Sequence, residues 1–293
     1  MVKANAGAAG IDKVSIDIFA KDLKNNLYKL WNRMSSGSYF PPAVKAVEIP
    51  KKSGGKRVLG IPTVGDRICQ AVVKLSFEPE VEKIFLNDSY GYRPNKSALE
   101  AIGVTRQRCF KYPWVIEFDI KAFFDNIPHN LLIKAVEKHS KRKWELLYIK
   151  RWLKADMQRT NGKVVGRECG TPQGGVISPV LSNLFLHYTF DAWVTKHYPT
   201  IKWCRYADDG LLHCRSQHEA IRLLASLKQR FSDCGLELHP DKTQIVYCKM
   251  SGRKENYPIK SFDFLGFTFR SRTGKKSGSG KLFTTFTPAA SKT

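Results

Sequence analysis

The feature that most constrains the fold of this chain is a pair of short apolar stretches, 201–206 and 210–214, joined by a very short connection. Strands joined this closely must pair as an antiparallel hairpin, because parallel pairing needs a long crossover. The connection is Ala207-Asp208-Asp209, which holds the only two adjacent acidic residues in the sequence. An Asp often serves a turn for conformational reasons alone. Two like charges at one turn repel each other, however, and a bound cation would offset that repulsion.

Another carboxylate stands at the end of a second predicted strand. The apolar run 114–118 leads into Asp119, and Glu117 is expected on the same face of that strand. A lone Asp at a strand end is usually a cap or a turn residue. Together with the acidic hairpin, Asp119 suggests a site for two Mg²⁺ ions, which prefer carboxylate and phosphate oxygens. Two such ions about 4 Å apart support nucleotidyl transfer, in which a 3′-hydroxyl attacks an incoming nucleotide.

The composition limits the class of protein and its partners. The chain has 293 residues, 42% of them hydrophobic, with 49 Lys+Arg against 26 Asp+Glu and a net charge of +23. This is a folded domain with a polyanionic partner, most plausibly nucleic acid, rather than a disordered basic tail. No apolar run approaches the roughly 18 residues that a membrane span needs. The seven Cys form no C-x-x-C pair, which favours reduced thiols in a cytoplasmic protein and excludes a zinc ribbon.

Helices and short strands alternate along the chain, which indicates an α+β architecture. Apolar periodicity and capping residues predict helices over 14–33, 63–75, 97–110, 128–138, 144–155, 178–193 and 216–234. Strands are predicted over 44–49, 57–61, 114–119, 201–206, 210–214, 243–248 and 262–269. A capping box is expected at Thr63 and Asp66. Residues 271–293 are rich in Gly, Ser, Lys and Thr and are weakly patterned.

Several motifs of the sequence resemble those of reverse transcriptases. FDIKAFFD at 118–125, GTPQGGVISP at 170–179 and RYADD at 205–209 occur in the order found in that family. More narrowly, they are similar to the motifs of the group II intron-encoded enzymes, or maturases. Further blocks extend this resemblance from residue 7 to about residue 269, at 9–12, 48–51, 60–67, 90–94, 238–243 and 264–267. A single Tyr-Ala-Asp-Asp is weak support, whereas many ordered blocks are specific.

The resemblance implies a right-hand polymerase fold with fingers and palm, an antiparallel palm sheet flanked by helices, and no thumb. It implies an N-terminal extension over 1–42 and fingers mainly over 43–112. The palm would span 113–270, with a remaining fingers segment around 135–175. Residues 271–293 would form a flexible tail or a truncated lead into a thumb, so the chain is expected to be a fragment of a longer protein.

The resemblance also implies roles for individual residues. The catalytic metal ligands would be Asp119, Asp208 and Asp209, with the backbone carbonyl of Ile120 as a further candidate, and would bind two Mg²⁺ ions that Mn²⁺ can replace. The incoming dNTP would be held by Lys45, Lys51, Arg57, Phe124 and Gln173. Nucleic-acid contacts are expected from Arg67, Arg93 and Lys242.

Some of these roles have structural alternatives in the sequence. Phe124 would be a steric gate against the sugar 2′ position, but core packing beside Phe123 explains it equally well. Lys51 and Arg57 could instead form a basic hairpin on the path of the template. Lys242 could be an ordinary surface lysine.

The expected function is that of an RNA-directed DNA polymerase from a bacterial group II intron maturase, which also binds intron RNA for splicing and retrohoming. Its partners would be an intron RNA template, a DNA or RNA primer and dNTP, with no membrane; a homodimer stays open. One alternative is an RNA-binding splicing cofactor with little polymerase activity, although the intact Asp triad favours a preserved metal site. Another is a retron or diversity-generating reverse transcriptase, against which the block at 60–67 and the N-terminal extension argue.

Overall fold

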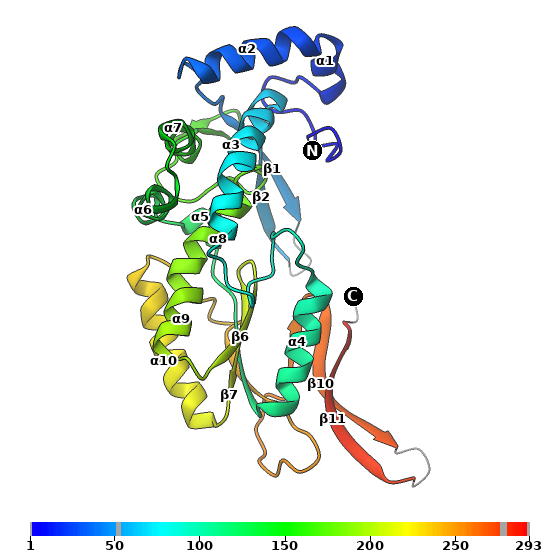
Figure 1. Ribbon diagram of the computed structural model, residues 1–293. Coiled ribbons are helices and arrows are strands. Elements are labelled where there is room, and N and C mark those ends of the chain that lie inside the picture. The colour runs from blue at the N-terminus through cyan, green and yellow to red at the C-terminus, as the bar shows by residue number, and fades with distance from the viewer. Residues whose placement is uncertain (1, 51–53, 276–279, 292–293) are drawn as a thin grey trace. The chain divides into compact units, whose positions relative to one another are not determined.

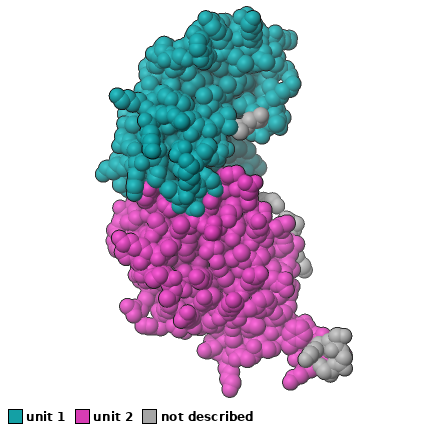
Figure 2. Space-filling view, viewed as in Figure 1, with its two compact units in different colours: residues 1–85, 122–185 teal, residues 86–121, 186–293 magenta. Residues whose placement is uncertain are grey.

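The computed structural model describes residues 2–50, 54–275 and 280–291, and the chain divides into two compact units (Figures 1 and 2). Unit 1 comprises Met1–Phe85 and Ala122–Phe185, and unit 2 comprises Leu86–Lys121 and Leu186–Thr293. Each unit combines helices with a four-stranded sheet, as the α+β prediction requires. Both units are built from separated chain segments, so neither is a simple stretch of sequence. Whether they correspond to fingers and palm stays a prediction.

Unit 1 holds most of the helices of the N-terminal half. A single helix was expected over 14–33, but the backbone leaves the helical region at Asp22 (φ −126°, ψ 52°) and two helices form. These and the other helices that begin in unit 1 are α1 (Ile16–Lys21), α2 (Leu23–Ser35), α3 (Val64–Glu82), α5 (Phe123–Asn126), α6 (His129–His139), α7 (Lys143–Leu153) and α8 (Ser178–Leu186).

The sheet of unit 1 contains the hairpin expected over 44–61. β1 (Val44–Pro50) and β2 (Lys56–Ile61) pair antiparallel with Lys45 opposite Ile61. β4 (Met157–Gln158) and β5 (Val164–Val165) complete the order β2-β1-β4-β5. The basic hairpin is therefore an edge of a sheet rather than an isolated ribbon.

Asp66 has a different role from the one its sequence spacing suggests. Thr63 does cap α3, because its hydroxyl accepts a hydrogen bond from the Asp66 backbone N–H at 3.1 Å. The Asp66 carboxylate is buried instead of capping, and it accepts hydrogen bonds from Tyr39 Oη at 2.8 Å and Trp152 Nε1 at 2.7 Å. Burial raises the pKa of Asp66 despite these donors. This network ties α3 and α7 to the segment after α2.

Unit 2 is a sheet of order β6-β7-β3-β8 with helices on its faces. α4 lies on one side of it, and α9 and α10 lie on the other (Figure 1). Phe118 packs against Phe190 and Phe231 on the α10 side, with ring centroids 5.0 and 5.7 Å away. Its main elements are α4 (Ala98–Lys111), β3 (Trp114–Phe118), the π-helical turn η1 (His187–Asp191), α9 (Ala192–His197), β6 (Lys202–Tyr206), β7 (Asp209–Cys214), α10 (Gln217–Asp233) and β8 (Gln244–Tyr247).

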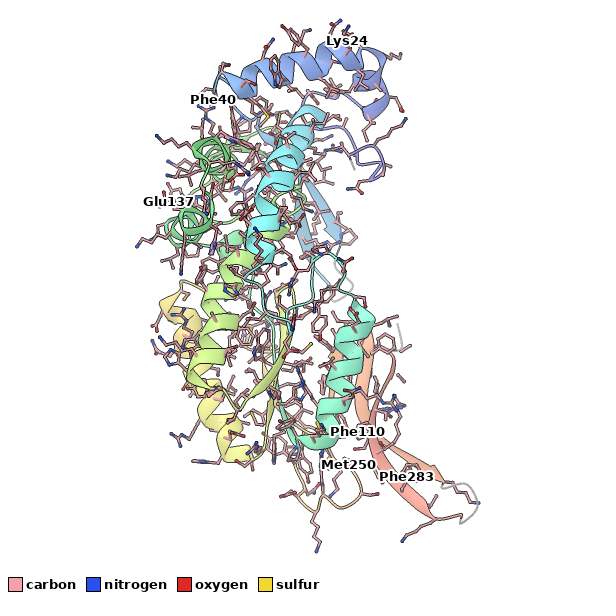
Figure 3. All side chains as sticks on the ribbon, in the orientation of Figure 1. Lys24, Phe40, Phe110, Glu137, Met250 and Phe283 are labelled. Carbon is pink, nitrogen blue, oxygen red and sulfur yellow. The ribbon has the colours of Figure 1, made fainter. Side chains whose placement is uncertain are left out.

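The weakly patterned C-terminal residues form a β-hairpin, so the expectation of a flexible tail is wrong for the part of them that is described. β10 (Phe267–Lys275) pairs with β11 (Leu282–Ala290), and β9 (Ser261–Phe264) completes a second sheet. Phe286 is fully buried and stacks near Phe262 at 6.1 Å, whereas Phe283 lies far out on the hairpin (Figure 3). Long-range pairing and one buried aromatic thus order a segment whose local pattern is weak.

The model contains no helix, among the residues it describes, with the length and apolarity that crossing a membrane requires.

Candidate active site

The acidic connection predicted from the sequence is a two-residue turn. Tyr206 pairs with Asp209, so Asp209 begins β7 and only Ala207 and Asp208 lie between the strands. Ala207 has φ +55°, in the left-handed region that non-glycine residues rarely adopt. Gly91 packs directly on this turn, since a Cβ at Gly91 would lie 2.3 Å from the Ala207 nitrogen. The backbone around Asp208 is therefore closely constrained.

Arg205 holds the same turn from inside the protein. Its guanidinium is fully buried and donates a hydrogen bond from Nη1 to the Ala207 carbonyl oxygen at 2.9 Å. Nη2 donates to Ser89 Oγ at 2.8 Å. A backbone in a strained conformation persists only where its surroundings fix it, and Arg205 supplies part of that support.

Strand register brings the third carboxylate to the hairpin. β3 and β7 are antiparallel with Phe118 opposite Gly210, so one step further Asp119 lies next to Asp209. Gly210 allows this register, because a Cβ there would lie 2.0 Å from Phe118 Cζ. The glycine after the two aspartates thus serves ring packing within the sheet and not the turn.

The three carboxylates influence one another electrostatically. Burial and the charge of Asp119 raise the pKa of Asp208. Asp209 lies at the exposed start of β7, yet partial desolvation and the charges of Asp208 and Asp119 raise its pKa to about 7. Closely spaced carboxylates of this kind resist simultaneous ionisation unless a cation is present.

Lys242 supplies the positive charge in this structure. Its ammonium donates to Asp119 Oδ2, and this bond raises the pKa of Lys242. Asp119 is anchored by its own backbone, whose carbonyl accepts from His239 N at 2.8 Å. The next residue, Ile120, is buried and bridges to Leu238.

The donor set fits a hard divalent cation in its chemistry. All three side chains offer carboxylate oxygens, and the Lys242 ammonium already takes a cation's position at Asp119. Within residues 2–50, 54–275 and 280–291, however, no three His, Cys, Asp or Glu side chains are arranged to hold one metal ion. Metal binding therefore requires Asp119 to turn from Lys242 toward the hairpin.

A cavity of about 530 Å³ adjoins these side chains in unit 2. Glu117, Asp119, Asp209 and Lys242 line one wall, and β9 with Asp263 lines another. Glu117 shares the cavity with Asp119, as the strand alternation predicts, and accepts a hydrogen bond from Gln244 Nε2 at 2.6 Å. Burial and the charges of Asp263 and Asp209 raise the pKa of Glu117 to about 7. An opening lined by acids and one lysine suits a cation together with a phosphorylated ligand.

Two of the predicted nucleotide-binding residues lie together in unit 1. The backbone N–H of Thr171 donates to the Phe124 carbonyl at 2.7 Å, and Gln173 Nε2 donates to Asp125 Oδ2 at 3.3 Å. Phe123 is the buried ring of the adjacent pair, whereas Phe124 is only half-buried, with the centroids 5.5 Å apart. Phe124 thus has a face available to a ligand.

The loop that carries Gln173 is also joined to β2. The backbone N–H of Gly60 donates to the Gln173 carbonyl at 2.7 Å, and a Cβ at Gly174 would lie 2.4 Å from the Gly60 oxygen. Lys45 on β1 and Arg57 on β2 are both exposed on this sheet. Lys51 lies outside the described residues.

Two predicted nucleic-acid contacts serve the fold instead. Arg67 is only 8% exposed and donates to the backbone carbonyls of Pro62, at 3.0 Å, and Ala8. Arg93 is half-buried and donates to the carbonyls of Leu86 at 2.6 Å and Ser89 at 2.7 Å. Placing phosphate contacts at these two residues is a correction we make, since a guanidinium bonded to internal carbonyls is not free to grip a phosphate.

The sequence analysis missed the supports of the turn, namely Arg205, Ser89 and Gly91. Arg205 stands inside a recognised motif, and an arginine within an otherwise apolar strand was a signal that could have found it. Ser89 and Gly91 lie more than 100 positions away in the sequence, and no local pattern marks them.

Comparisons with known proteins agree with this geometry. A family model described as reverse transcriptase (RNA-dependent DNA polymerase) matches residues 49–269. Protein YkfC of Escherichia coli (strain K12) is 33% identical over 292 residues, covering 83% of this chain and 73% of that protein.

Intron-encoded proteins are also similar to the chain. The group II intron-encoded protein LtrA of Lactococcus lactis subsp. cremoris is 34% identical over 187 residues, covering 63% of this chain and 31% of LtrA. The putative COX1/OXI3 intron 2 protein of Saccharomyces cerevisiae is 33% identical over 177 residues, covering 60% of this chain and 19% of that protein. The chain thus spans less than a third of either of these two proteins. The narrower resemblance to group II intron-encoded enzymes is confirmed, and the chain belongs to the reverse transcriptase (RNA-dependent DNA polymerase) family.

Proposed function

We propose that this reverse transcriptase extends a primer 3′-hydroxyl by metal-dependent nucleotidyl transfer, with Asp119, Asp208 and Asp209 as the metal ligands. The observation that supports this assignment best is the β3–β7 register, which brings Asp119 beside the two-residue turn of Asp208. The raised pKa values of Asp208 and Asp209 express an excess of negative charge that bound cations would neutralise.

Two Mg²⁺ ions, which Mn²⁺ can replace, would activate the attacking hydroxyl and stabilise the leaving pyrophosphate when bound. The three carboxylates would hold them, with the Ile120 carbonyl as a further candidate ligand. Lys242 holds Asp119 in a defined rotamer until the cations arrive. Released from that ion pair, its ammonium can contact the primer backbone at the same cavity.

Residues of unit 1 would bind the incoming dNTP. Arg57 and Lys45 are exposed cations on one sheet, and guanidinium and ammonium groups both suit a triphosphate. Lys51 belongs to the same proposal by sequence alone. The half-buried ring of Phe124 and the amide of Gln173 would face the sugar and base.

The wider biological role rests on the relatives. LtrA is named as a group II intron-encoded protein, and we infer that this chain likewise uses intron RNA as template, with a DNA or RNA primer, in splicing and retrohoming. In this proposal unit 1 corresponds mainly to fingers and unit 2 mainly to palm. The net charge of +23 would hold the nucleic-acid backbone.

The test is primer extension on an RNA template with Mg²⁺, comparing the wild type with Asp208→Asn. The isosteric change removes one ligand charge, and we expect extension to fall by about a thousandfold, the scale of a lost charge-stabilising group. Asp233→Asn on the exposed end of α10 is the matched control and should leave the rate unchanged. A wild type that binds intron RNA tightly but extends no primer would favour the splicing-cofactor alternative instead.

A further inference from the structure

A second cavity, of about 880 Å³, lies wholly within unit 1 and is not lined by any residue of the carboxylate site. It lies where the start of α6 and the end of α7 meet the segment that precedes the Gln173 loop. Its lining residues are Pro128, His129, Asn130, Lys154, Gly166, Arg167, Glu168 and Cys169.

Two cations at this cavity have no partner in the described part of the chain. Arg167 Nε is buried without a hydrogen-bond partner, and no carboxylate pairs with the Arg167 guanidinium or with Lys154 Nζ among the described residues. Burial lowers the pKa of Arg167, as expected for a charge that lacks full solvation. Glu168 lines the same cavity without pairing with either cation. Partly buried cations are normally paired, so this arrangement needs an anion.

The cations act on one another across the cavity. Burial and then the charges of Arg167 and Lys154 lower the pKa of His129. His129 Nε2 is engaged with the Gly170 carbonyl at 2.7 Å, which fixes the ring. Asp125 offsets part of the charge of Arg167 but also accepts a hydrogen bond from Gln173. The net field at this opening is positive.

The start of α6 adds backbone donors to the same opening. Pro128 is its N-cap and provides no side-chain cap, and the first backbone bond runs from Leu132 N to the Pro128 carbonyl at 3.0 Å. The N–H groups of His129 and Asn130 are thus available at the positive end of the helix dipole. The other end of α6 is held differently, by an ion pair of Glu137 with Lys150 at 3.0 Å (Figure 3).

We propose that this cavity binds a phosphate group, held by Arg167, Lys154 and the N-terminal backbone of α6. A phosphate offers several acceptor oxygens, which match a guanidinium fork, an ammonium and two backbone N–H groups. The phosphate can belong to a nucleic-acid strand or to a free nucleotide or pyrophosphate. The site goes beyond the proposed polymerase function and does not depend on the metal site.

Cys169 makes the proposal measurable without polymerase activity. It lines the cavity and is the one exposed thiol of the seven cysteines, all of which are described. Its alkylation by iodoacetamide should therefore report occupancy of the cavity, and Cys169→Ser identifies the labelled site. Under mass action, ligand at about four times its Kd should slow labelling roughly fivefold.

The experiment measures the labelling rate of Cys169 with and without inorganic pyrophosphate or a short oligoribonucleotide. We expect protection in the wild type and its loss in Arg167→Gln and in Lys154→Gln. Lys163→Gln, an exposed lysine on the nearby β4–β5 turn, is the matched control and should retain protection. Unchanged thermal unfolding of Lys154→Gln keeps the test valid if Arg167→Gln fails to fold.

The two probes distinguish the sources of the phosphate. Protection by pyrophosphate supports a free ligand, and protection by the oligoribonucleotide alone supports a strand. Failure of both probes to protect Cys169 overturns the proposal. Equal protection of the wild type and both glutamine variants overturns it too, because the cations would then have no part in binding.

Discussion

Arg205 and Asp191 form a bidentate ion pair that is completely buried in unit 2. Nε donates to Oδ1 at 2.7 Å and Nη2 donates to Oδ2 at 2.6 Å, and both side chains are 0% exposed. The third guanidinium nitrogen reaches the Ala207 carbonyl. The pair therefore connects η1 to the turn that carries Asp208, and it positions a candidate metal ligand without touching substrate.

Asp191→Asn should destabilise the protein by about 3–5 kcal/mol, because it leaves the buried Arg205 without a counter-charge. The measurement is urea unfolding at neutral pH. Glu237→Gln removes a pair with Lys121 that is 53% and 63% exposed, and this control should cost less than about 1 kcal/mol. Equal costs for the two variants would contradict the importance of burial.

The double variant Arg205→Met with Asp191→Leu separates stability from positioning. Replacing a buried ion pair with apolar residues can restore most of the stability. The Ala207 carbonyl nevertheless loses its donor, so we expect primer extension to stay impaired by about tenfold or more. Full recovery of extension would show that Arg205 stabilises the fold and does nothing further for the turn.

Lys242→Gln should tighten metal binding in the absence of nucleic acid. The ammonium occupies Asp119 Oδ2, and a divalent cation must displace it. Removing a competition worth about 1.4 kcal/mol would raise the affinity about tenfold. Titration of Mn²⁺ followed by electron paramagnetic resonance measures it, with Lys121→Gln as the control for loss of a nearby exposed charge. An unchanged Mn²⁺ affinity would exclude this competition.

His213 on β7 should make unit 2 sensitive to acid. Neither ring nitrogen has a hydrogen-bond partner among the described residues, and burial followed by the charge of Arg108 lowers the His213 pKa to about 3. Between about pH 6.5 and 3 the unfolded chain therefore binds a proton that the folded chain does not, so stability falls as pH falls. The loss is about 1.4 kcal/mol per pH unit, or about 2 kcal/mol at pH 5.

The comparison that isolates His213 is urea unfolding of the wild type and His213→Leu at pH 7.5 and pH 5. Glu117 and Asp209 have folded pKa values near 7, above their unfolded values, so they favour the folded state as pH falls. Their contribution is present in both proteins and cancels in the difference. The stability of the variant relative to the wild type should rise by about 2 kcal/mol on going to pH 5. A difference that does not change with pH would mean that His213 is hydrated or paired in solution.

Phe124→Ala should weaken the discrimination against ribonucleotides. Phe123 fills the core position, which leaves the half-buried Phe124 ring free to meet the sugar. Loss of a ring that excludes one hydroxyl should reduce selectivity by about tenfold or more, measured as the ratio of kcat/KM for dNTP and NTP. Phe124→Tyr should retain the selectivity. If the alanine variant discriminates as the wild type does, Phe124 is not a gate.

Local patterns were sufficient for most elements and for the acids themselves. The β6–β7 hairpin, the strand ending before Asp119 and the cap at Thr63 all follow from alternation, turn length and hydroxyl capping within a few residues. The order of the motifs was also sufficient to indicate the family, which the comparisons confirm. These features depend on neighbours in the sequence, so the sequence contains them directly.

The roles of several charged residues were decided by tertiary contacts. Arg67 and Arg93 are basic residues in recognised motifs, yet each spends its donors on backbone carbonyls of the fold. Asp66 has the spacing of a capping residue but is buried between α3 and α7. Whether a charge is paired inside or free outside depends on burial, which no short window of sequence reports.

By itself the sequence determined the chemistry available to this protein: three aspartates at strand ends, a basic surface and the motif order of a reverse transcriptase. Only the tertiary structure decided the arrangement of that chemistry. The register of β3 against β7 brings Asp119 to Asp209, buried Arg205 holds the turn, and Arg167 and Lys154 are left unpaired around a separate cavity. Register and burial are set by long-range packing, because shifting a strand by one residue changes no local pattern yet moves every side chain to the opposite face.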